Sequence, residues 1–509
     1  MTIFPCLNGE QAMKISNDVM KYFLQILLIL FIAVNIQNVH AHKQITVNII
    51  GEINLGNTTD SDSVNFENTS KVFDRASYLF NEALATFTTI GTTFIDPRSN
   101  YITNHSNGIK VPSDYAKILS SNNITAVSTS NMHVGAFGFE GITSTVEALR
   151  NYNIEFAGIK SFCETTIFEK GGVKFGFASF GNSPHSPSIS DSVKIKQLIN
   201  NLDNKCDIVV VAFSIKENAL HTHTINSTKS TYLKIAEIFA HTCIEEGADI
   251  VYGNGINTPS EIELFKDRLI VYGLGKFCTP FGTIRHGEAS CSPLIRVNLF
   301  SDGTFDNATI HSFRQTDNTG PYADVEMDAI KIIRNKTYSA FTDNLLSISE
   351  EGKVTPNVKS NSAIAIEILD EGRTHLGKRY VRGTAGPKTF DCSGFTSFIF
   401  RTIGIELHRT SQGQYQQGLK ISRAELKPGD LVFFQGSASR GIGHVGVVVS
   451  VDKKNNSFKF MHAANRGVVI DDFAKASYYI RRYVGATRII GEIAPSNYNS
   501  NNEQINTTI

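Results

Sequence analysis

The stretch Asp391-Cys392-Ser393-Gly394-Phe395 decides the fold that we predict for the C-terminal third of the chain. Residues with helical spacing follow from Phe395 to Ile403, so Cys392 stands at the N-terminus of a predicted helix. Unpaired N–H groups and the positive end of the helix dipole stabilise a thiolate there and lower the cysteine pKa. A lone cysteine in an amphipathic helix is more often a small buried side chain. Its neighbours must therefore decide between these interpretations.

Two histidines lie on neighbouring predicted strands. His444 begins an apolar strand that runs to Val451, and His462 ends the next strand. The polar turn between them predicts a β-hairpin centred near Lys454, which places His462 opposite Gly446, one step from His444 on the same face. His462 is then positioned to bond one nitrogen of His444 while the other nitrogen takes the thiol proton. Either histidine alone would be interpreted as a core residue, but their joint spacing favours catalysis.

The surrounding segment, residues 361–490, has an α+β order. Helices are predicted over 364–376 and 395–403, and strands follow over 430–434, 443–451 and 457–462. Such an order predicts helices packed against an antiparallel sheet.

The domain resembles the NlpC/P60 family of cell-wall cysteine peptidases, which have a papain-like fold. About 130 residues match, in the order of the family. The matching pieces are Tyr380-Val381, Asp391-Cys392-Ser393-Gly394-Phe395, Leu407-His408-Arg409-Thr410-Ser411, Leu426-Lys427-Pro428-Gly429-Asp430-Leu431-Val432-Phe433-Phe434, His444-Val445-Gly446 and Met461-His462-Ala463.

The resemblance implies the catalytic roles. Cys392 is expected to be the nucleophile, His444 the general base and His462 the residue that orients it. Tyr380 matches a family tyrosine whose hydroxyl helps to hold the oxyanion, although packing in the core is an equally good role for it. No metal or other cofactor is expected.

Three further positions are expected to bind substrate. Asp391 and Ser411 match residues that hold a free N-terminal amine in relatives acting on wall fragments, and Arg409 serves either a substrate carboxylate or the fold. Two departures lie nearby: His408 replaces the usual proline, and Arg382-Gly383-Thr384 replaces Trp-Gly-Gly. Both are expected to reshape the substrate groove.

The family reaction is hydrolysis of the bond between γ-D-glutamate and a diamino acid in peptidoglycan stem peptides. The expected partner is peptidoglycan or muropeptide fragments, with no role for nucleic acid. An amidase or acyltransferase with the same thiol chemistry is one alternative. A non-catalytic wall-binding protein is the other.

The N-terminal region, residues 42–314, alternates predicted strands and helices, which indicates an α/β domain with a layered sheet. It resembles the CapA family, whose fold is metallophosphatase-like. The matching stretches are Gly51-Glu52-Ile53, Ser130-Asn131-Met132-His133, Gly138-Phe139-Glu140-Gly141, Gly247-Ala248-Asp249-Ile250-Val251 and Tyr272-Gly273-Leu274-Gly275-Lys276-Phe277.

The departures from CapA fall on the metal ligands. Glu52 replaces an aspartate, Met132 replaces an asparagine beside the surviving His133, and Gly253-Asn254-Gly255-Ile256-Asn257 has lost every histidine of Gly-His-His-Pro-His. Amide and thioether groups are poor substitutes for these ligands. We therefore predict no catalytic metal. The pair His221 and His223 is expected to be solvated in a loop.

The chain as a whole is predicted to be exported to the periplasm or beyond. Lys14 and Lys21 precede an apolar run that is short for a membrane span, and Ala41 ends a cleavage-like motif, so residues 1–41 are expected to be a signal peptide. An uncleaved anchor is the alternative. After cleavage, no stable membrane insertion is expected. Residues 315–360 are predicted as a helical segment and a linker, and 491–509 as a disordered tail.

Charge and cysteine content fit this assignment. The chain has 509 residues, with 48 Lys+Arg and 48 Asp+Glu, but residues 361–490 carry 19 basic against 10 acidic side chains. A basic domain attracts acidic wall peptides, although a solvated basic face is also possible. Cys392 is the single cysteine of its domain, whereas five others lie in the N-terminal region, where export permits disulfides.

Overall fold

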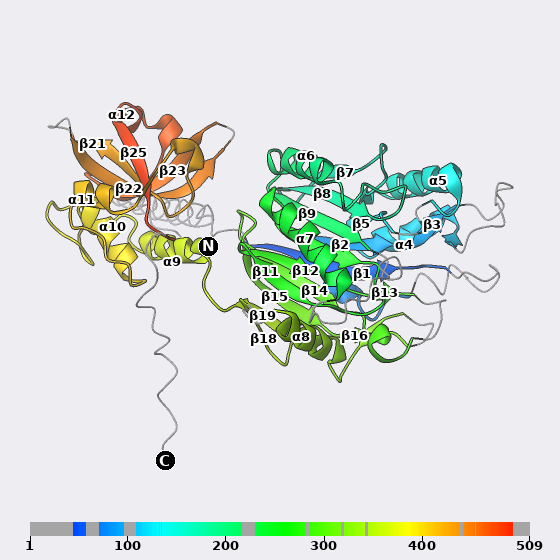
Figure 1. Ribbon diagram of the computed structural model, residues 1–509. Helices are drawn as coiled ribbons and strands as arrows, with labels where there is room; N and C mark the ends of the chain where they lie inside the picture. The colour runs from blue at the N-terminus through cyan, green and yellow to red at the C-terminus, as the bar shows by residue number, and fades with distance from the viewer. Residues whose placement is uncertain are drawn as a thin grey trace, which may run out of the picture. The chain divides into compact units, whose positions relative to one another are not determined.

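The structure is a computed structural model. It describes residues 44–56, 71–95, 108–131, 133, 135–215, 230–279, 285–316, 320–341, 345–436, 441–453 and 455–491. The predicted signal peptide, Met132, the pair His221 and His223, and the tail after Gly491 lie outside these residues. Two sheet-bearing domains follow one another along the chain (Figure 1).

The N-terminal domain is built on two large sheets. The first has the order β18-β19-β15-β14-β1-β2-β5-β6, with β13 also paired to β1. Its strands are β1 (Ile45–Ile53), β2 (Ala85–Ile90), β5 (Ala126–Ser128), β6 (Glu155–Ala157), β13 (Lys276–Cys278), β14 (Leu294–Leu299), β15 (Phe305–His311), β18 (Leu346–Ile348) and β19 (Lys353–Pro356). The second has the order β11-β12-β10-β9-β8-β7. Its strands are β7 (Thr165–Lys170), β8 (Val173–Gly181), β9 (Ile208–Ser214), β10 (Ile250–Asn254), β11 (Ile262–Phe265) and β12 (Arg268–Val271).

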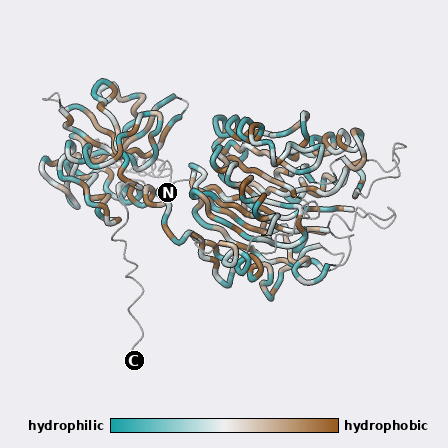
Figure 2. The backbone as a smooth tube through the Cα atoms, in the orientation of Figure 1, coloured by the Kyte–Doolittle hydropathy of each residue, from teal (hydrophilic) through white to brown (hydrophobic). Residues whose placement is uncertain are grey.

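The two sheets pack face to face through one apolar core. Val47 and Phe87 of the first sheet belong to the same buried cluster as Phe175 and Val210 of the second. The ring centroids of Phe87 and Phe175 lie 6.0 Å apart across the interface. Figure 2 shows hydrophobic residues concentrated along these inner strands. Short strand pairs complete the domain: β3 (Thr92–Phe94) with β4 (Ile109–Val111), and β16 (Phe313–Arg314) with β17 (Tyr322–Ala323).

Helices cover both outer faces of this sandwich. The first sheet packs its outer face on α3 (Ser77–Phe80), α4 (Ala116–Ser121) and α5 (Gly138–Asn151). The second sheet is covered by α6 (Ser192–Asp203) and α7 (Thr231–Glu245). The order helix, sheet, sheet, helix confirms the predicted α/β class.

The first sheet extends past the boundary predicted at residue 314. After α8 (Asp328–Ala340), the strands β18 and β19 pair with each other, and β19 pairs with β15. Two strands therefore lie within residues 315–360, where only a helical segment and a linker were expected. Leu346, Ile348 and Val354 are buried, but their short alternation among polar residues gave little signal.

The C-terminal domain has helices packed against an antiparallel sheet of order β20-β25-β21-β22-β23-β24, which confirms the predicted α+β order. The helices are α9 (Asn361–Arg373), α10 (Cys392–Arg401), α11 (Ser411–Gln417) and α12 (Ser477–Ile480). The strands are β20 (Leu419–Ile421), β21 (Leu431–Gln435), β22 (Ile442–Asp452), β23 (Ser457–Ala464), β24 (Gly467–Asp472) and β25 (Tyr483–Arg488).

The two faces of this sheet have separate cores. Phe395 and Ile399 of α10 pack on Val445 and Leu431. On the opposite face, Phe434, Phe458 and Phe460 form an aromatic cluster with Phe473. This second cluster surrounds the histidines described below.

The register of β22 and β23 changes once along the hairpin. Near the turn Asp452 pairs with Ser457, whereas nearer the histidines Val447 pairs with Met461, because a bulge lies between Val448 and Ser450. The second register continues to Gly446 opposite His462. This is the pairing expected from the sequence.

Within the described residues, no helix combines the length and apolarity that a membrane span requires. The six described cysteines are all free thiols: Cys163, Cys206, Cys243, Cys278, Cys291 and Cys392.

An ion pair links the buried Asp430, which precedes β21, to the partly exposed Arg488 of β25, with Nε and Nη2 of the arginine 2.9 and 2.8 Å from the carboxylate. Asp430 is 3% exposed, and burial raises its pKa. Replacing Arg488 by Met leaves the carboxylate uncompensated, so we expect the domain to lose about 3 kcal/mol of unfolding free energy. Chemical denaturation measures this. Lys475→Met, which removes an exposed pair with Asp472, should leave stability nearly unchanged; equal losses in both variants would contradict the prediction.

Candidate active site

Cys392 is the first residue of α10, as the sequence predicted, and Asp391 caps the helix. The N–H of Gly394 donates to Oδ1 of Asp391 at 2.7 Å. Phe395, Ile399 and Phe400 anchor the helix in the core, so the N-terminal turn is held in place. The thiol is 8% exposed.

The sulfur lies against the segment that carries His444. In this conformation the thiol donates to the carbonyl oxygen of Gly443, with Sγ and O 3.9 Å apart, rather than to the imidazole. The N–H of Val445 also acts on the sulfur. The structure therefore brings Cys392 to the backbone on both sides of His444.

The electrostatics of the thiol differ from the prediction. Burial raises the pKa of Cys392, and the negative charge of Asp391 raises it further. The N–H groups of Ser393 and Val445 act in the opposite direction without reversing the shift. The helix N-terminus was expected to lower this pKa, but the carboxylate that caps it opposes the dipole. The resting sulfur is a thiol.

His444 and His462 form a direct hydrogen bond. Nε2 of His444 is 2.8 Å from Nδ1 of His462, and the two rings are nearly perpendicular. The register that puts Gly446 opposite His462 requires a small residue there, because a Cβ on Gly446 would lie 3.1 Å from Cβ of His462. With Nε2 occupied, Nδ1 is the nitrogen of His444 that remains for another partner.

Burial keeps both imidazoles neutral. It lowers the pKa of His444 to about 3, with a smaller contribution from His462. It also lowers the pKa of His462, which is fully buried. A neutral imidazole is the form that accepts a proton.

Two residues of this site were missed by the sequence analysis. Oδ2 of Asp471, at the end of β24, is 3.1 Å from Nε2 of His462. The ring of Tyr479 stacks on His444, and its hydroxyl lies 3.4 Å from Nδ1 of His462. Extending the hairpin pattern into β24 would have found Asp471. Tyr479 comes from the short helix α12 and had no periodic signal.

Two of the predicted substrate-binding residues, Asp391 and Arg409, form an ion pair with each other. The guanidinium of Arg409 donates to both carboxylate oxygens of Asp391, with Nη2 2.7 Å from Oδ2 and Nη1 3.1 Å from Oδ1. The N–H of Gly383 also donates to Oδ2. These contacts fix the carboxylate of Asp391 at the start of α10, and its role in binding substrate stays a prediction. Ser411 is buried at the start of α11.

Tyr380 lies near the nucleophile. Its backbone bridges to Phe390, two residues before Cys392. Burial raises the pKa of the phenol, and the neighbouring Cys392 and Asp391 raise it further, so the hydroxyl stays protonated and is able to donate.

Gln414 is a further residue that the sequence analysis missed. Its buried amide donates to the carbonyl oxygens of Ser393 and His408, at 3.0 and 2.8 Å, and accepts from Thr396 at 2.8 Å. It therefore locks α11 to the first turn of α10.

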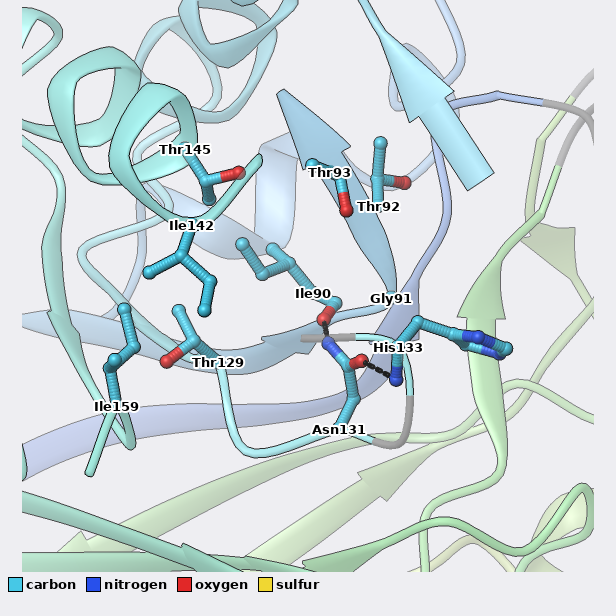
Figure 3. Close-up of a pocket in the computed structure, with 10 residues that line it drawn as sticks. All are labelled: Ile90, Gly91, Thr92, Thr93, Thr129, Asn131, His133, Ile142, Thr145 and Ile159. Atoms are coloured by element: carbon cyan, nitrogen blue, oxygen red, sulfur yellow. Dashed lines mark hydrogen bonds between the residues drawn. The ribbon is translucent and has the colours of Figure 1, made fainter. Parts of the chain in front are cut away.

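Two asparagines, Asn131 and Asn254, lie at the CapA-like positions of the N-terminal domain. Asn131 accepts from the N–H of His133 and donates to the carbonyl of Ile90 (Figure 3). The imidazole of His133 points away from the threonines and isoleucines lining this pocket. Asn254 donates to Thr89 at 2.8 Å. Among the described residues, no three His, Cys, Asp or Glu side chains gather to hold an ion, and the lack of a catalytic metal stays a prediction.

Two family models match the chain. The NlpC/P60 family model matches residues 377–488. The model described as "Bacterial capsule synthesis protein PGA_cap" matches residues 46–280.

Known proteins similar to the chain include two that are named as endopeptidases. "Probable endopeptidase p60" of Listeria seeligeri is 43% identical over 114 residues, which cover 21% of each chain. "Murein DD-endopeptidase MepS/Murein LD-carboxypeptidase" of Escherichia coli (strain K12) is 35% identical over 136 residues, which cover 26% of this chain and 68% of that protein. The chain thus spans about a fifth of the length of the Listeria protein.

Two solved structures are among those similar to the chain. The "NlpC/p60 domain of peptidoglycan hydrolase SagA" is 25% identical and covers 25% of this chain and 98% of that chain, with a TM-score of 0.21. An NlpC/P60 family protein from Bacillus cereus is 26% identical and covers 28% and 50%, with a TM-score of 0.23.

The pKa of His444 gives a test that needs no substrate. Because burial lowers this pKa to about 3, the imidazole should stay neutral as the pH falls from 8 to about 5, well past the ordinary histidine value of about 6.5. NMR of isotope-labelled histidine across this range measures it. The signal of His286, an exposed side chain on the N-terminal domain, serves as the reference. A midpoint for His444 near 6.5 would show that the site is wetter than described.

Proposed function

Because this chain belongs to the NlpC/P60 family through its C-terminal domain, we propose that it is a cysteine endopeptidase that hydrolyses peptidoglycan stem peptides. Cys392 is the nucleophile, His444 the general base and His462 the orienting residue. The observation that carries this function is the placement of a buried thiol at a helix N-terminus, beside the backbone of His444, while His462 holds the far nitrogen of that histidine.

The reaction begins with Cys392 as a thiol and His444 as a neutral imidazole. Nδ1 of His444 takes the proton of Cys392 as the sulfur attacks the carbonyl carbon of the peptide bond. The negative charge moves to the carbonyl oxygen. We assign the N–H of Cys392 and the hydroxyl of Tyr380 as the donors that hold it.

The intermediate collapses when the protonated His444 gives its proton to the leaving amine, which breaks the peptide bond. The acyl group then remains on Sγ. Water, deprotonated by His444, attacks the thioester and releases the acid and the free thiol. Asp471 stabilises the imidazolium form of His444 through the intervening His462, since its negative charge raises the His444 pKa.

The bond that we propose joins γ-D-glutamate to the diamino acid of the stem peptide, as expected from the family resemblance. The name of the E. coli relative favours a second candidate function, which is that of a DD-endopeptidase or LD-carboxypeptidase. Both candidates use the same thiol chemistry. They differ in the product.

The setting that we propose is outside the cytoplasm, where peptidoglycan lies. Positive charge supports it, since residues 361–490 carry 19 basic against 10 acidic side chains and stem peptides carry carboxylates. The N-terminal domain is proposed as an accessory domain that shapes substrate binding without metal chemistry.

Digestion of defined muropeptides by the full chain tests the proposed function. Mass analysis should show hydrolysis at the γ-D-glutamyl bond by the wild type, and Cys392→Ala should lower the rate by at least ~10³-fold, because the nucleophile is lost. Cys206→Ala is the matched control. Its thiol lies in the N-terminal domain and burial raises its pKa to about 11, so the variant should keep full activity.

Other products would change the assignment. Monomers released from cross-linked dimers would indicate the DD-endopeptidase. Loss of a sugar-linked amide, or transfer of the acyl group to an amine, would indicate the amidase or acyltransferase. Binding of peptidoglycan without hydrolysis would indicate a wall-binding protein.

A further inference from the structure

A carboxylate closes the site on the side of His462 that faces away from His444. Oδ2 of Asp471 lies 3.1 Å from Nε2 of His462, whose side chain has no exposure to solvent. The hydrogen bond from His462 and contacts with Arg466 hold the Asp471 pKa at about 2. An ionised carboxylate can only accept hydrogen bonds. Nε2 of His462 must therefore carry the hydrogen.

The hydrogen on Nε2 leaves Nδ1 of neutral His462 as an acceptor. Two donors converge on this nitrogen, namely Nε2 of His444 at 2.8 Å and the hydroxyl of Tyr479 at 3.4 Å. Nε2 of His444 then carries a hydrogen as well. In a neutral imidazole the lone pair must lie on the other nitrogen, so Nδ1 of His444 is the free base.

We propose that Asp471 is a positioning residue, which sets the tautomers of both histidines so that Nδ1 of His444 can accept the thiol proton. The catalytic consequence rests on the proposed function, whereas the tautomers follow from the geometry alone. A carboxylate that fixes a histidine from behind is the arrangement of the serine triad. Here the carboxylate fixes the tautomer of His462, and His462 in turn fixes the tautomer of His444.

Arg466 has the secondary role of orienting this carboxylate. Its Nη2 lies 2.9 and 2.8 Å from the two oxygens of Asp471, and its side chain is 65% exposed. An exposed pair of this kind contributes little free energy. The hydrogen bond to His462 should therefore persist without the arginine.

The first test is spectroscopic and uses the unmodified full chain. Long-range ¹H–¹⁵N correlation spectra of labelled histidine distinguish protonated from unprotonated ring nitrogens. Near pH 7, we expect hydrogen on Nε2 of both His444 and His462 and none on Nδ1 of either. Hydrogen on Nδ1 of His444 would overturn the proposal, whether or not the protein cleaves a muropeptide.

The second test replaces the carboxylate by an amide. In Asp471→Asn, the new NH₂ group can donate to Nε2 of His462 and so reverse both tautomers. We expect kcat on a muropeptide to fall at least ~10²-fold with KM within about threefold, since the same exchange in the serine triad costs ~10⁴-fold. The ring-nitrogen signals should reverse in the same variant, which a merely structural role would not cause.

Asp472→Asn is the matched control, because it makes the same charge change one residue away. Asp472 accepts from the N–H of Ala474 at 3.1 Å and pairs with Lys475, and an amide oxygen preserves the first contact. This variant should keep the wild-type kcat and tautomers. Full activity in Asp471→Asn, or an equal loss in Asp472→Asn, would overturn the proposal. A wild type that cleaves no muropeptide would refute the proposed function instead, and the spectra would still decide the tautomers.

Discussion

The hydrogen bond between His444 and His462 is the interaction on which the active-site arrangement depends. It exists because the inner parts of β22 and β23 pair in the register that places Gly446 opposite His462, and because the bonded rings lie among Phe434, Phe460 and Tyr479. A one-residue slip would send one histidine to the opposite face. The aromatic surroundings exclude water, which makes charge costly and favours the neutral base.

Much of the C-terminal domain could be predicted from the sequence, because its signals are local. The helix after Cys392 and the hairpin around Lys454 follow from short-range periodicity, and the register then places His444 near His462. The thiol pKa could not be predicted in this way. It depends on the burial of Cys392 and on the charge of Asp391, which a helix pattern does not report.

The rest of the site depends on longer-range packing. Asp471 contacts His462 from β24, the strand that pairs with β23. Tyr479 of α12 stacks on His444. Gln414 joins two helices that no periodic pattern links. In the N-terminal domain, the alternating elements predicted the class, but β18 and β19 were missed because each buries few side chains.

The bulge between Val448 and Ser450 separates the hairpin into two parts that pair in different registers. Strand pairing restarts on its inner side, and the turn at Asn455 and Asn456 lies on its outer side. Bulges absorb extra residues locally. A change in the length of the turn should therefore leave the spacing of the two imidazoles constant. The turn is for the same reason a suitable site for inserting a tag or a binding module.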